Sequence, residues 1–160
     1  MKVLVFSDSH GDVKNMCRAI AREQPRMVLH LGDGWHDAEA VAERFPELPL
    51  EKVPGNCDFR YQEEAVRLVL IEGKLVLLSH GHTLGVKNNL SILLREAQAR
   101  GADVALFGHT HKPFVDIRNG VTMLNPGSIG DYQRPTYGTL TFENGQCIAA
   151  THVLEKRKLL

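Results

Sequence analysis

Short apolar runs that end in polar, glycine-containing segments recur along this chain, and their order limits the folds open to it. Residues 2–6 and 27–31 have the composition of buried strands. Between them, the apolar residues of 13–20 follow the spacing of one helical face, and residues 38–45 repeat that pattern. A short strand is expected at residues 50–53. The first third of the chain therefore predicts consecutive βαβ units.

The second half of the chain is rich in hairpin signals. Strand-like residues 65–71 and 74–79 flank Glu72 and Gly73, and Asn-Gly pairs at 119–120 and 144–145 join further β runs. An Asn-Gly pair between β runs is the strongest short-range signal for a hairpin. An antiparallel set of strands is therefore expected after the βαβ units.

These patterns together predict the architecture. A third helix is expected from Leu90 to Ala97, with Gly101 just beyond its C-terminal end. The economical solution is an α/β fold in which a two-sheet β-sandwich is flanked by helices, in four layers ordered α/β/β/α. Residues 1–160 are predicted to form a single domain, since this length suits one core.

Composition argues against several classes of partner. The 19 Lys and Arg residues balance 19 Asp and Glu residues, so no broad basic face for a nucleic acid is expected. No run approaches the roughly 20 apolar residues that a membrane helix needs. The three cysteines are widely spaced, which argues against a disulfide framework. We expect a cytoplasmic protein without a membrane partner.

Metal-competent side chains follow five of the predicted strands. They are Asp8, His10, Asp33, Asn56, His80, His109 and His111. A single Asp or His after a strand is usually a turn former or a helix cap. Its recurrence after five strands, each time near a glycine, instead predicts one site outside the carboxyl ends of the strands.

The composition of this set indicates which ions would bind. Seven ligands are too many for one ion and suit two. Imidazole and carboxylate ligands favour zinc, iron, manganese or nickel over calcium, and the lack of a thiolate ligand argues against a structural zinc site. We expect two divalent transition-metal ions.

The order of the motifs resembles a known family. Asp8-Ser9-His10, Gly32-Asp33, Gly55-Asn56-Cys57-Asp58, His80-Gly81-His82 and Gly108-His109-Thr110-His111 follow the signature of the calcineurin-like metallophosphoesterases. The chain is most similar to the small bacterial and archaeal phosphodiesterases of that superfamily, and Asn125-Pro126-Gly127-Ser128 resembles a loop that they carry near the site.

This resemblance implies a ligand assignment and a reaction. One ion would be held by Asp8, His10, Asp33 and His111, and the other by Asp33, Asn56, His80 and His109, with Asp33 bridging. Manganese is the first expectation for the metal, with nickel, iron and zinc as alternatives. The implied activity is hydrolysis of small phosphate esters, diesters before monoesters, by in-line attack of a metal-bridging hydroxide.

The expected catalytic residues are Asn56, Asp33, His82 and Cys57. Cys57 stands where many larger members have a histidine that can protonate the leaving group. Nearby metals would favour its thiolate, which cannot donate a proton, so weaker help for poor leaving groups is expected.

Several other polar residues have more than one interpretation. Asp58 would orient Asn56 or a ligand histidine, or form a turn, and Asp37 would cap the second helix. His30 would be a buried, hydrogen-bonded histidine, while His152 and the tail after it would be solvated. Arg134 would contact phosphate or simply belong to a loop.

A second function stays open beside the enzyme. The retromer subunit of this superfamily has a similar size and fold and acts mainly through protein contacts. A scaffold would be expected to lose ligand residues, and this chain keeps all seven. The oligomeric state is not readable from the sequence, although a homodimer is the commonest assembly.

Overall fold

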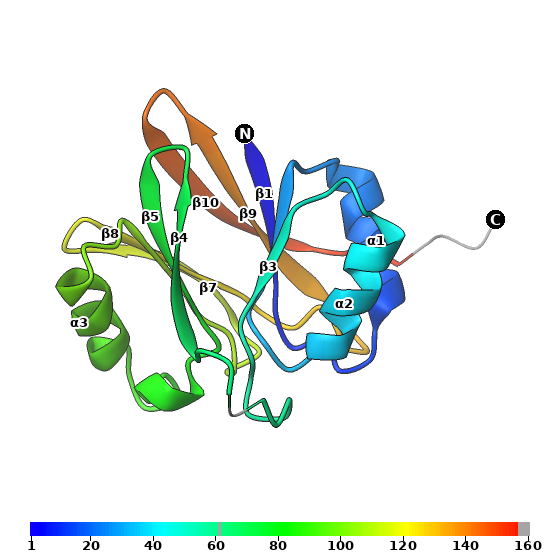
Figure 1. The fold of residues 1–160 in the computed structure, drawn as a ribbon, viewed down its shortest axis with the longest axis horizontal. Coiled ribbons are helices and arrows are strands. Elements are labelled where there is room, and N and C mark those ends of the chain that lie inside the picture. Colours follow the sequence, from blue (N-terminus) through cyan, green and yellow to red (C-terminus); the bar gives the residue numbers. More distant parts are fainter. Residues whose placement is uncertain (61, 157–160) are drawn as a thin grey trace.

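Residues 1–60 and 62–156 are described by the computed structural model, and in them ten strands form two five-stranded sheets. The sheets pack face to face (Figure 1). Helices α1 (Val13–Glu23) and α2 (Trp35–Arg44) cover the outer face of one sheet, and α3 (Ser91–Ala99) covers the outer face of the other. This arrangement confirms the predicted two-sheet sandwich with helices outside.

The first sheet has the strand order β10-β9-β1-β2-β3. Its strands are β1 (Lys2–Phe6), β2 (Met27–His30), β3 (Leu50–Lys52), β9 (Thr136–Glu143) and β10 (Gln146–Val153). The parallel strands β1, β2 and β3 are joined through α1 and α2, as the βαβ pattern predicted. Because the three strands run the same way, the loops that follow them emerge at the same end of the sheet, beyond the carboxyl ends of the strands.

The second sheet has the order β4-β5-β6-β8-β7. Its strands are β4 (Val66–Ile71), β5 (Lys74–Ser79), β6 (Val104–Leu106), β7 (Pro113–Arg118) and β8 (Val121–Pro126). β5, β6 and β8 are parallel, while β4 and β7 are antiparallel edge strands. A short 3₁₀ helix, η1 (His82–Leu84), follows β5.

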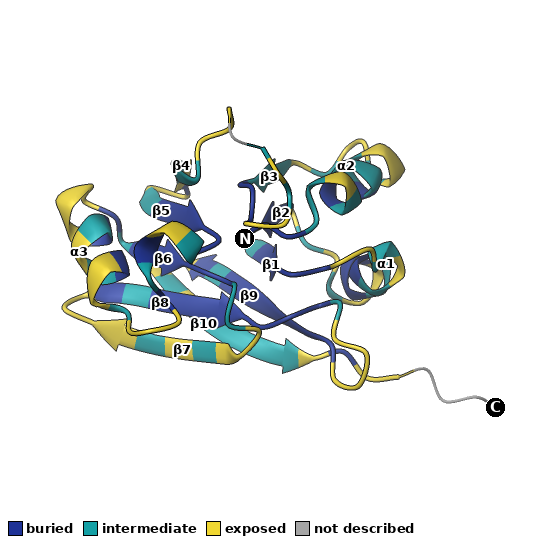
Figure 2. Cartoon of the chain, turned by 90° about the horizontal axis from the view of Figure 1, so that it is seen from below, coloured by how far each residue is buried: buried dark blue, intermediate teal, exposed yellow. Residues whose placement is uncertain are grey.

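Alternation of side chains along the strands divides the core into layers. In β1, Val3 and Val5 point between the sheets, whereas Leu4 and Phe6 point toward α1 and α2. All four side chains are fully buried, which is why the run is continuously apolar. Figure 2 shows the buried strands between partly exposed helices.

The ends of the helices agree with the sequence in two places and differ in one. Asp12 caps α1 by accepting a hydrogen bond from the Asn15 amide, and Gly101 follows the C-cap of α3 with a left-handed φ of 69°. The prediction that Asp37 caps α2 is wrong. The helix begins at Trp35, with Gly34 as its N-cap residue, so Asp37 lies inside the first turn.

All three predicted hairpin turns are present, between β4 and β5, β7 and β8, and β9 and β10. In each, two consecutive residues have positive φ, as in Asn119 (50°) and Gly120 (76°). Such turns match the natural twist of a hairpin. Within the described residues, no helix is long and apolar enough to cross a membrane.

Candidate metal centre

The loops after β1, β2, β5 and β6 converge at one end of the sandwich. Within the first sheet, the Asp8 amide donates to the Gly32 carbonyl at 2.9 Å. Within the second, the Gly108 amide donates to the His80 carbonyl at 2.9 Å. Between the sheets, His80 Nδ1 lies 2.9 Å from the carbonyl oxygen of Leu31. Residues far apart in sequence are thereby held around one point.

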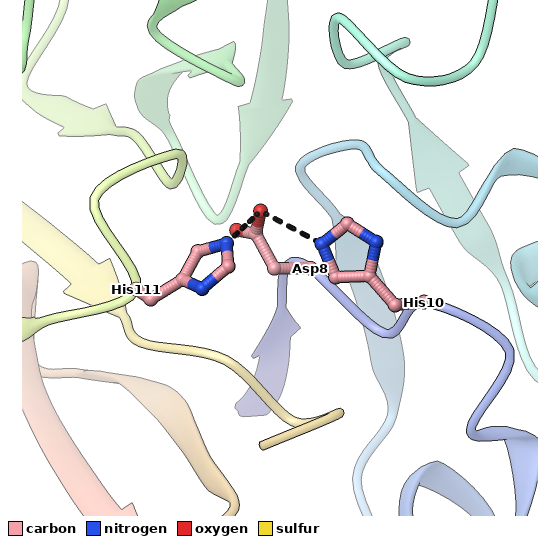
Figure 3. Close-up of side chains that lie close together, drawn as sticks. All are labelled: Asp8, His10 and His111. Atoms are coloured by element: carbon pink, nitrogen blue, oxygen red, sulfur yellow. Dashed lines mark ion pairs between the residues drawn. The ribbon is translucent and has the colours of Figure 1, made fainter.

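Asp8, His10 and His111 form a first group of possible metal ligands (Figure 3). Asp8 Oδ1 lies 3.0 Å from His111 Nε2 and 3.7 Å from His10 Nε2. The Asp8 side chain is fully buried, whereas both histidines are partly exposed. A solvent-accessible ion could therefore bind against a fixed, buried carboxylate.

Asp8, Asp33 and His80 form a second group, and all three are buried. His80 Nε2 lies 3.4 Å from Asp33 Oδ2 and 3.9 Å from Asp8 Oδ1. Asp33 Oδ2 also lies 3.8 Å from His10 Nε2. Both carboxylates therefore reach histidines of both groups, an arrangement that suits two neighbouring ions.

The remaining predicted ligands lie around this second group. His109 Nδ1 is 3.2 Å from His80 Nε2, and the His109 amide donates to Asp8 Oδ2. Asn56 is exposed on the loop after β3, where its Nδ2 lies 3.5 Å from Cys57 Sγ. That loop is tied to the site by the Cys57 amide, which donates to Asp33 Oδ1 at 2.9 Å.

One buried atom tests whether this donor set fits a cation. Asp8 Oδ1 is buried and, among the described residues, has no hydrogen-bond donor. It faces Nε2 atoms of three histidines at 3.0–3.9 Å. A buried carboxylate oxygen without a partner is costly unless it is paired or coordinates a metal. The residues therefore fit a divalent metal with imidazole and carboxylate ligands.

The charges of the site shift the pKa values of its members in opposite directions. Burial raises the pKa of Asp33, but the hydrogen bond and charge of His80 and the Cys57 amide outweigh it and hold that pKa well below its usual range. Burial lowers the pKa of His80, yet Asp33 and Asp8 outweigh it, so the pKa is raised. Asp33 therefore stays ionised at neutral pH.

The pKa values of the other titratable residues at the site respond chiefly to burial. Burial, with a smaller contribution from the charge of His80, lowers the pKa of His82 and of His109. His82 Nδ1 is buried without a hydrogen-bond partner among the described residues. Burial and then the charge of Asp33 raise the pKa of Cys57, so the protein's own groups favour the thiol. The thiolate that the sequence analysis expected would require the positive charge of bound ions.

Asp58 has a role that the sequence analysis only partly anticipated. Its carboxylate accepts hydrogen bonds from four backbone amides at 2.7–3.0 Å, those of Asp33, Gly34, Trp35 and Gly55. It therefore fixes the backbone of the Asp33 loop and the start of α2, rather than a ligand side chain. This explains why α2 begins without Asp37 as its cap.

Other serine and loop residues support Asp8. Ser7 Oγ donates to Asp8 Oδ2 at 2.5 Å, and Ser128 Oγ donates to the Asp8 carbonyl at 2.8 Å. Asn125 Nδ2 donates to the Gly108 carbonyl, so the loop of residues 125–128 does lie at the site. Ser7 was missed because a serine at the end of a strand has no distinctive sequence pattern.

Two peripheral residues are placed outside the ligand set. Arg134 is exposed and lines a pocket of about 490 Å³ together with His111 and Asp131. His152 was predicted to be solvated, but it has protein partners. Its Nε2 lies 2.8 Å from Thr139 Oγ1, and its ring stacks on Tyr137. The described part of the tail continues to Lys156.

Comparison with known proteins agrees with the fold and with the family that the motifs resemble. The pattern of the calcineurin-like phosphoesterase superfamily domain matches residues 1–145. The probable metallophosphoesterase YsnB of Bacillus subtilis (strain 168) is 34% identical over 150 residues, covering 90% of this chain and 86% of the relative. The chain therefore belongs to the calcineurin-like phosphoesterase superfamily.

Other relatives and structures add detail. The phosphodiesterase YfcE of Escherichia coli (strain K12) is 29% identical over 154 residues, covering 81% of this chain and 79% of YfcE. The crystal structure of a predicted phosphoesterase from Streptococcus pneumoniae TIGR4 has a TM-score of 0.79 and 24% identity, covering 95% of this chain and 88% of that one. Vps29 from Entamoeba histolytica, crystallised with zinc, has a TM-score of 0.74 and 19% identity, covering 96% and 99%.

Proposed function

We propose that this protein is a two-metal phosphoesterase that prefers phosphodiesters. The observation that carries the proposal is the buried, unpartnered Asp8 Oδ1, which faces three histidine nitrogens. Family membership supports hydrolysis of phosphate esters, and the relative YfcE, named a phosphodiesterase, supports the preference for diesters. We expect the physiological substrate to be a small phosphate ester.

The proposed ligand sets are those that the family resemblance implies, and the two groups of side chains in the structure support them in part. Asp8, His10 and His111 would hold one ion together with Asp33, and His80, His109 and Asn56 would hold the other, again with Asp33. Two divalent ions would supply positive charge for the phosphoryl oxygens and would lower the pKa of a water, so that it could lose a proton near neutral pH and serve as hydroxide for the attack on phosphorus. We infer manganese as the first metal to test, with nickel, iron and zinc as alternatives.

The chain's own groups would position the substrate around that centre. Asn56 is exposed beside the ligand Asp33 and can offer its amide to a phosphoryl oxygen. His82 lies close to His80 and His109, with ring centroids 5.4 and 6.3 Å away, and would contact the phosphate from the side of η1. Ionised Asp33 would keep its charge available to both ions.

Cys57 is proposed to lie near the leaving group. Because a thiol is a weak hydrogen-bond donor, turnover should be slow for alkyl esters, whose leaving groups need a proton, and faster for aryl esters. Cys57→His should raise kcat on alkyl diesters while leaving aryl diesters nearly unchanged. Equal kcat of the variant and the wild type on alkyl esters would exclude this role.

The direct test compares hydrolysis of bis(p-nitrophenyl) phosphate with that of p-nitrophenyl phosphate. Metal-stripped protein is supplied with Mn²⁺, Ni²⁺, Zn²⁺ or Mg²⁺, and the Asn56→Ala and His109→Ala variants serve as controls. We expect metal-dependent release that is faster for the diester and that both substitutions abolish. Faster release from the monoester would overturn the diester preference.

A second candidate is a protein-binding scaffold, suggested by the fold that this chain shares with Vps29. The same assay separates the two functions. Binding of two ions without turnover of either substrate, with any of the metals, would favour the scaffold and direct the search to a protein partner.

A further inference from the structure

A second polar cluster, formed by Ser9, His30 and Asp37, lies behind the metal ligands. Ser9 and His30 are buried, at 0% and 1% exposure, and belong to the loop after β1 and to β2. Ser9 Oγ lies 2.9 Å from His30 Nε2 and donates to Asp37 Oδ2 at 2.7 Å. The cluster therefore links β1, β2 and α2 at the point where the first metal-binding loops begin.

The direction of every hydrogen bond in this cluster follows from one contact. The Gly32 amide donates to His30 Nδ1 at 3.1 Å, so in the neutral ring the proton is on Nε2. His30 Nε2–H therefore donates to Ser9 Oγ, whose own proton goes to Asp37. Burial lowers the pKa of His30 to about 4, which agrees with a neutral ring at neutral pH.

This direction excludes a nucleophilic Ser-His-Asp site. In such a triad the histidine accepts the serine proton and the aspartate contacts the histidine. Here the histidine donates to the serine, and the aspartate contacts the serine instead. Ser9 is also fully buried, so no substrate could reach its hydroxyl. The cluster is built to hold loops in place.

The loops that it holds carry strained ligand residues. Asp8, His10 and Asp33 have φ values of 55°, 42° and 56°, in the left-handed region that non-glycine residues rarely occupy. Ser9 lies between two of them. Asp37 Oδ2 also accepts from the Gly11 amide at 2.8 Å, directly after His10. The cluster thus ties down both sides of the turn that presents Asp8 and His10.

The cluster needs a glycine at position 34, because any side chain there would collide with it. A Cβ at Gly34 would lie 1.9 Å from Ser9 Oγ and 2.9 Å from Asp37 Oδ2. Its φ of 162° is accessible to any residue, so steric room and not backbone conformation requires glycine here. The residue after Asp33 therefore makes room for the Ser9 hydroxyl.

We propose that Ser9, His30 and Asp37 are positioning residues that set metal affinity by fixing the strained turns of Asp8, His10 and Asp33. This inference rests on the metal centre proposed above. Residues that orient metal ligands typically change metal affinity by about 10–100-fold when they are removed. Loss of the cluster would leave the seven ligands present but their loops free to relax.

The test measures Mn²⁺ affinity by calorimetry and the melting temperature with and without Mn²⁺. Ser9→Ala and Asp37→Ala should each weaken binding by about tenfold and reduce the Mn²⁺-induced rise in Tm. Asp37→Asn should stay near wild type, because its amide oxygen can accept from both Ser9 and Gly11. Thr139→Val is the matched control, since it removes a partly buried hydroxyl–histidine contact in the β9–β10 hairpin.

The outcomes separate the possible failures. If wild type binds no Mn²⁺, the proposed metal centre fails and the role of the cluster fails with it. If wild type binds but Ser9→Ala and Asp37→Ala bind within twofold of it, only the positioning role is overturned. Equal losses of Tm with and without Mn²⁺ would show a purely structural cluster. Should Asp37→Ala fail to fold, Ser9→Ala, which removes a single hydroxyl, still decides the question.

Discussion

The two ends of the sandwich both contain residues with left-handed backbone, but for different reasons. At the hairpin turns, such residues occur as pairs such as Asn119-Gly120 and Asn144-Gly145, in which glycine relieves the strain. At the candidate metal centre, five of the proposed ligands have positive φ, and all are aspartate or histidine. They are Asp8, His10, Asp33, His109 and His111. In each hairpin turn glycine therefore takes one of the two left-handed positions, whereas each of these five positions at the site holds a non-glycine residue.

Hydrogen bonds keep these residues in the left-handed conformation. A non-glycine residue in the left-handed region costs on the order of 1 kcal/mol or more. Asp58 binds four amides around Asp33, and Ser9 and Asp37 hold the Asp8–His10 turn. Side-chain identity at the site is therefore set by ligand chemistry, and hydrogen bonds to Asp37 and Asp58 enforce the backbone conformation.

The largest expected effect is the loss of activity in Asp33→Asn. Asparagine has the same shape and tolerates left-handed φ, so the loop should keep its fold. It lacks the charge that faces His10 and His80, so kcat/KM on bis(p-nitrophenyl) phosphate should fall by roughly 10²–10³-fold or more. Asp116→Asn, on the exposed edge strand β7, should match wild type. Activity within tenfold of wild type would contradict the role of Asp33.

The second effect concerns acid stability of the metal-stripped protein. His30 has its pKa lowered to about 4 by burial, so between pH 6.5 and 4 the unfolded chain binds a proton that the folded chain does not. The free energy of unfolding should therefore fall with decreasing pH, by on the order of 3 kcal/mol in all from this group.

Urea unfolding of wild type and His30→Gln between pH 7 and 4.5 isolates this contribution, since other groups also titrate there. The variant should show the shallower pH dependence, whatever its stability at pH 7. His36→Gln, a substitution of an exposed histidine, is the control. Parallel curves for wild type and His30→Gln would refute the argument.

Local patterns were enough to predict the strands, the hairpins and the clustering of Asp8, His10, Asp33, His80 and His111. Periodicity and Asn-Gly pairs act over a few residues, and side chains that follow the parallel strands of one sheet gather at one end of that sheet. The prediction that Asp37 caps α2 was wrong because the start of this helix depends on a residue distant in sequence. Asp58 lies more than twenty residues further along the chain, and its carboxylate accepts hydrogen bonds from the backbone amides at the start of α2. The helix therefore needs no local cap.

The Ser9–His30–Asp37 cluster was unpredictable for the same reason. His30 and Asp37 are 21 and 28 residues from Ser9, and the three residues meet only after β1, β2 and α2 have packed. His30 was correctly predicted to be a buried, hydrogen-bonded histidine, because a histidine inside an apolar strand needs a partner. The identity of that partner depends on tertiary structure.

A third, smaller effect tests the hairpin end. Gly120 has φ of 76°, and a Cβ there would meet no atom within 4 Å. Gly120→Ala should therefore lower the free energy of unfolding by about 1 kcal/mol through backbone strain alone. Its kcat/KM should equal that of wild type, because no ligand depends on this turn. A change in kcat/KM would show that the two ends are coupled.

The smallest effect is the most direct measure of strain at the site. His10 has φ of 42° and a partly exposed side chain that lies 3.7 Å from Asp8. His10→Asn should raise the unfolding free energy of the metal-free chain by a few tenths of a kcal/mol, because asparagine adopts left-handed φ more readily. The same variant should lose much of the stabilisation by Mn²⁺, since one ligand is missing. Urea unfolding with and without Mn²⁺ measures both changes. A destabilised metal-free variant would mean that His10 is unstrained, and the contrast between the two ends would then rest on the remaining four ligands alone.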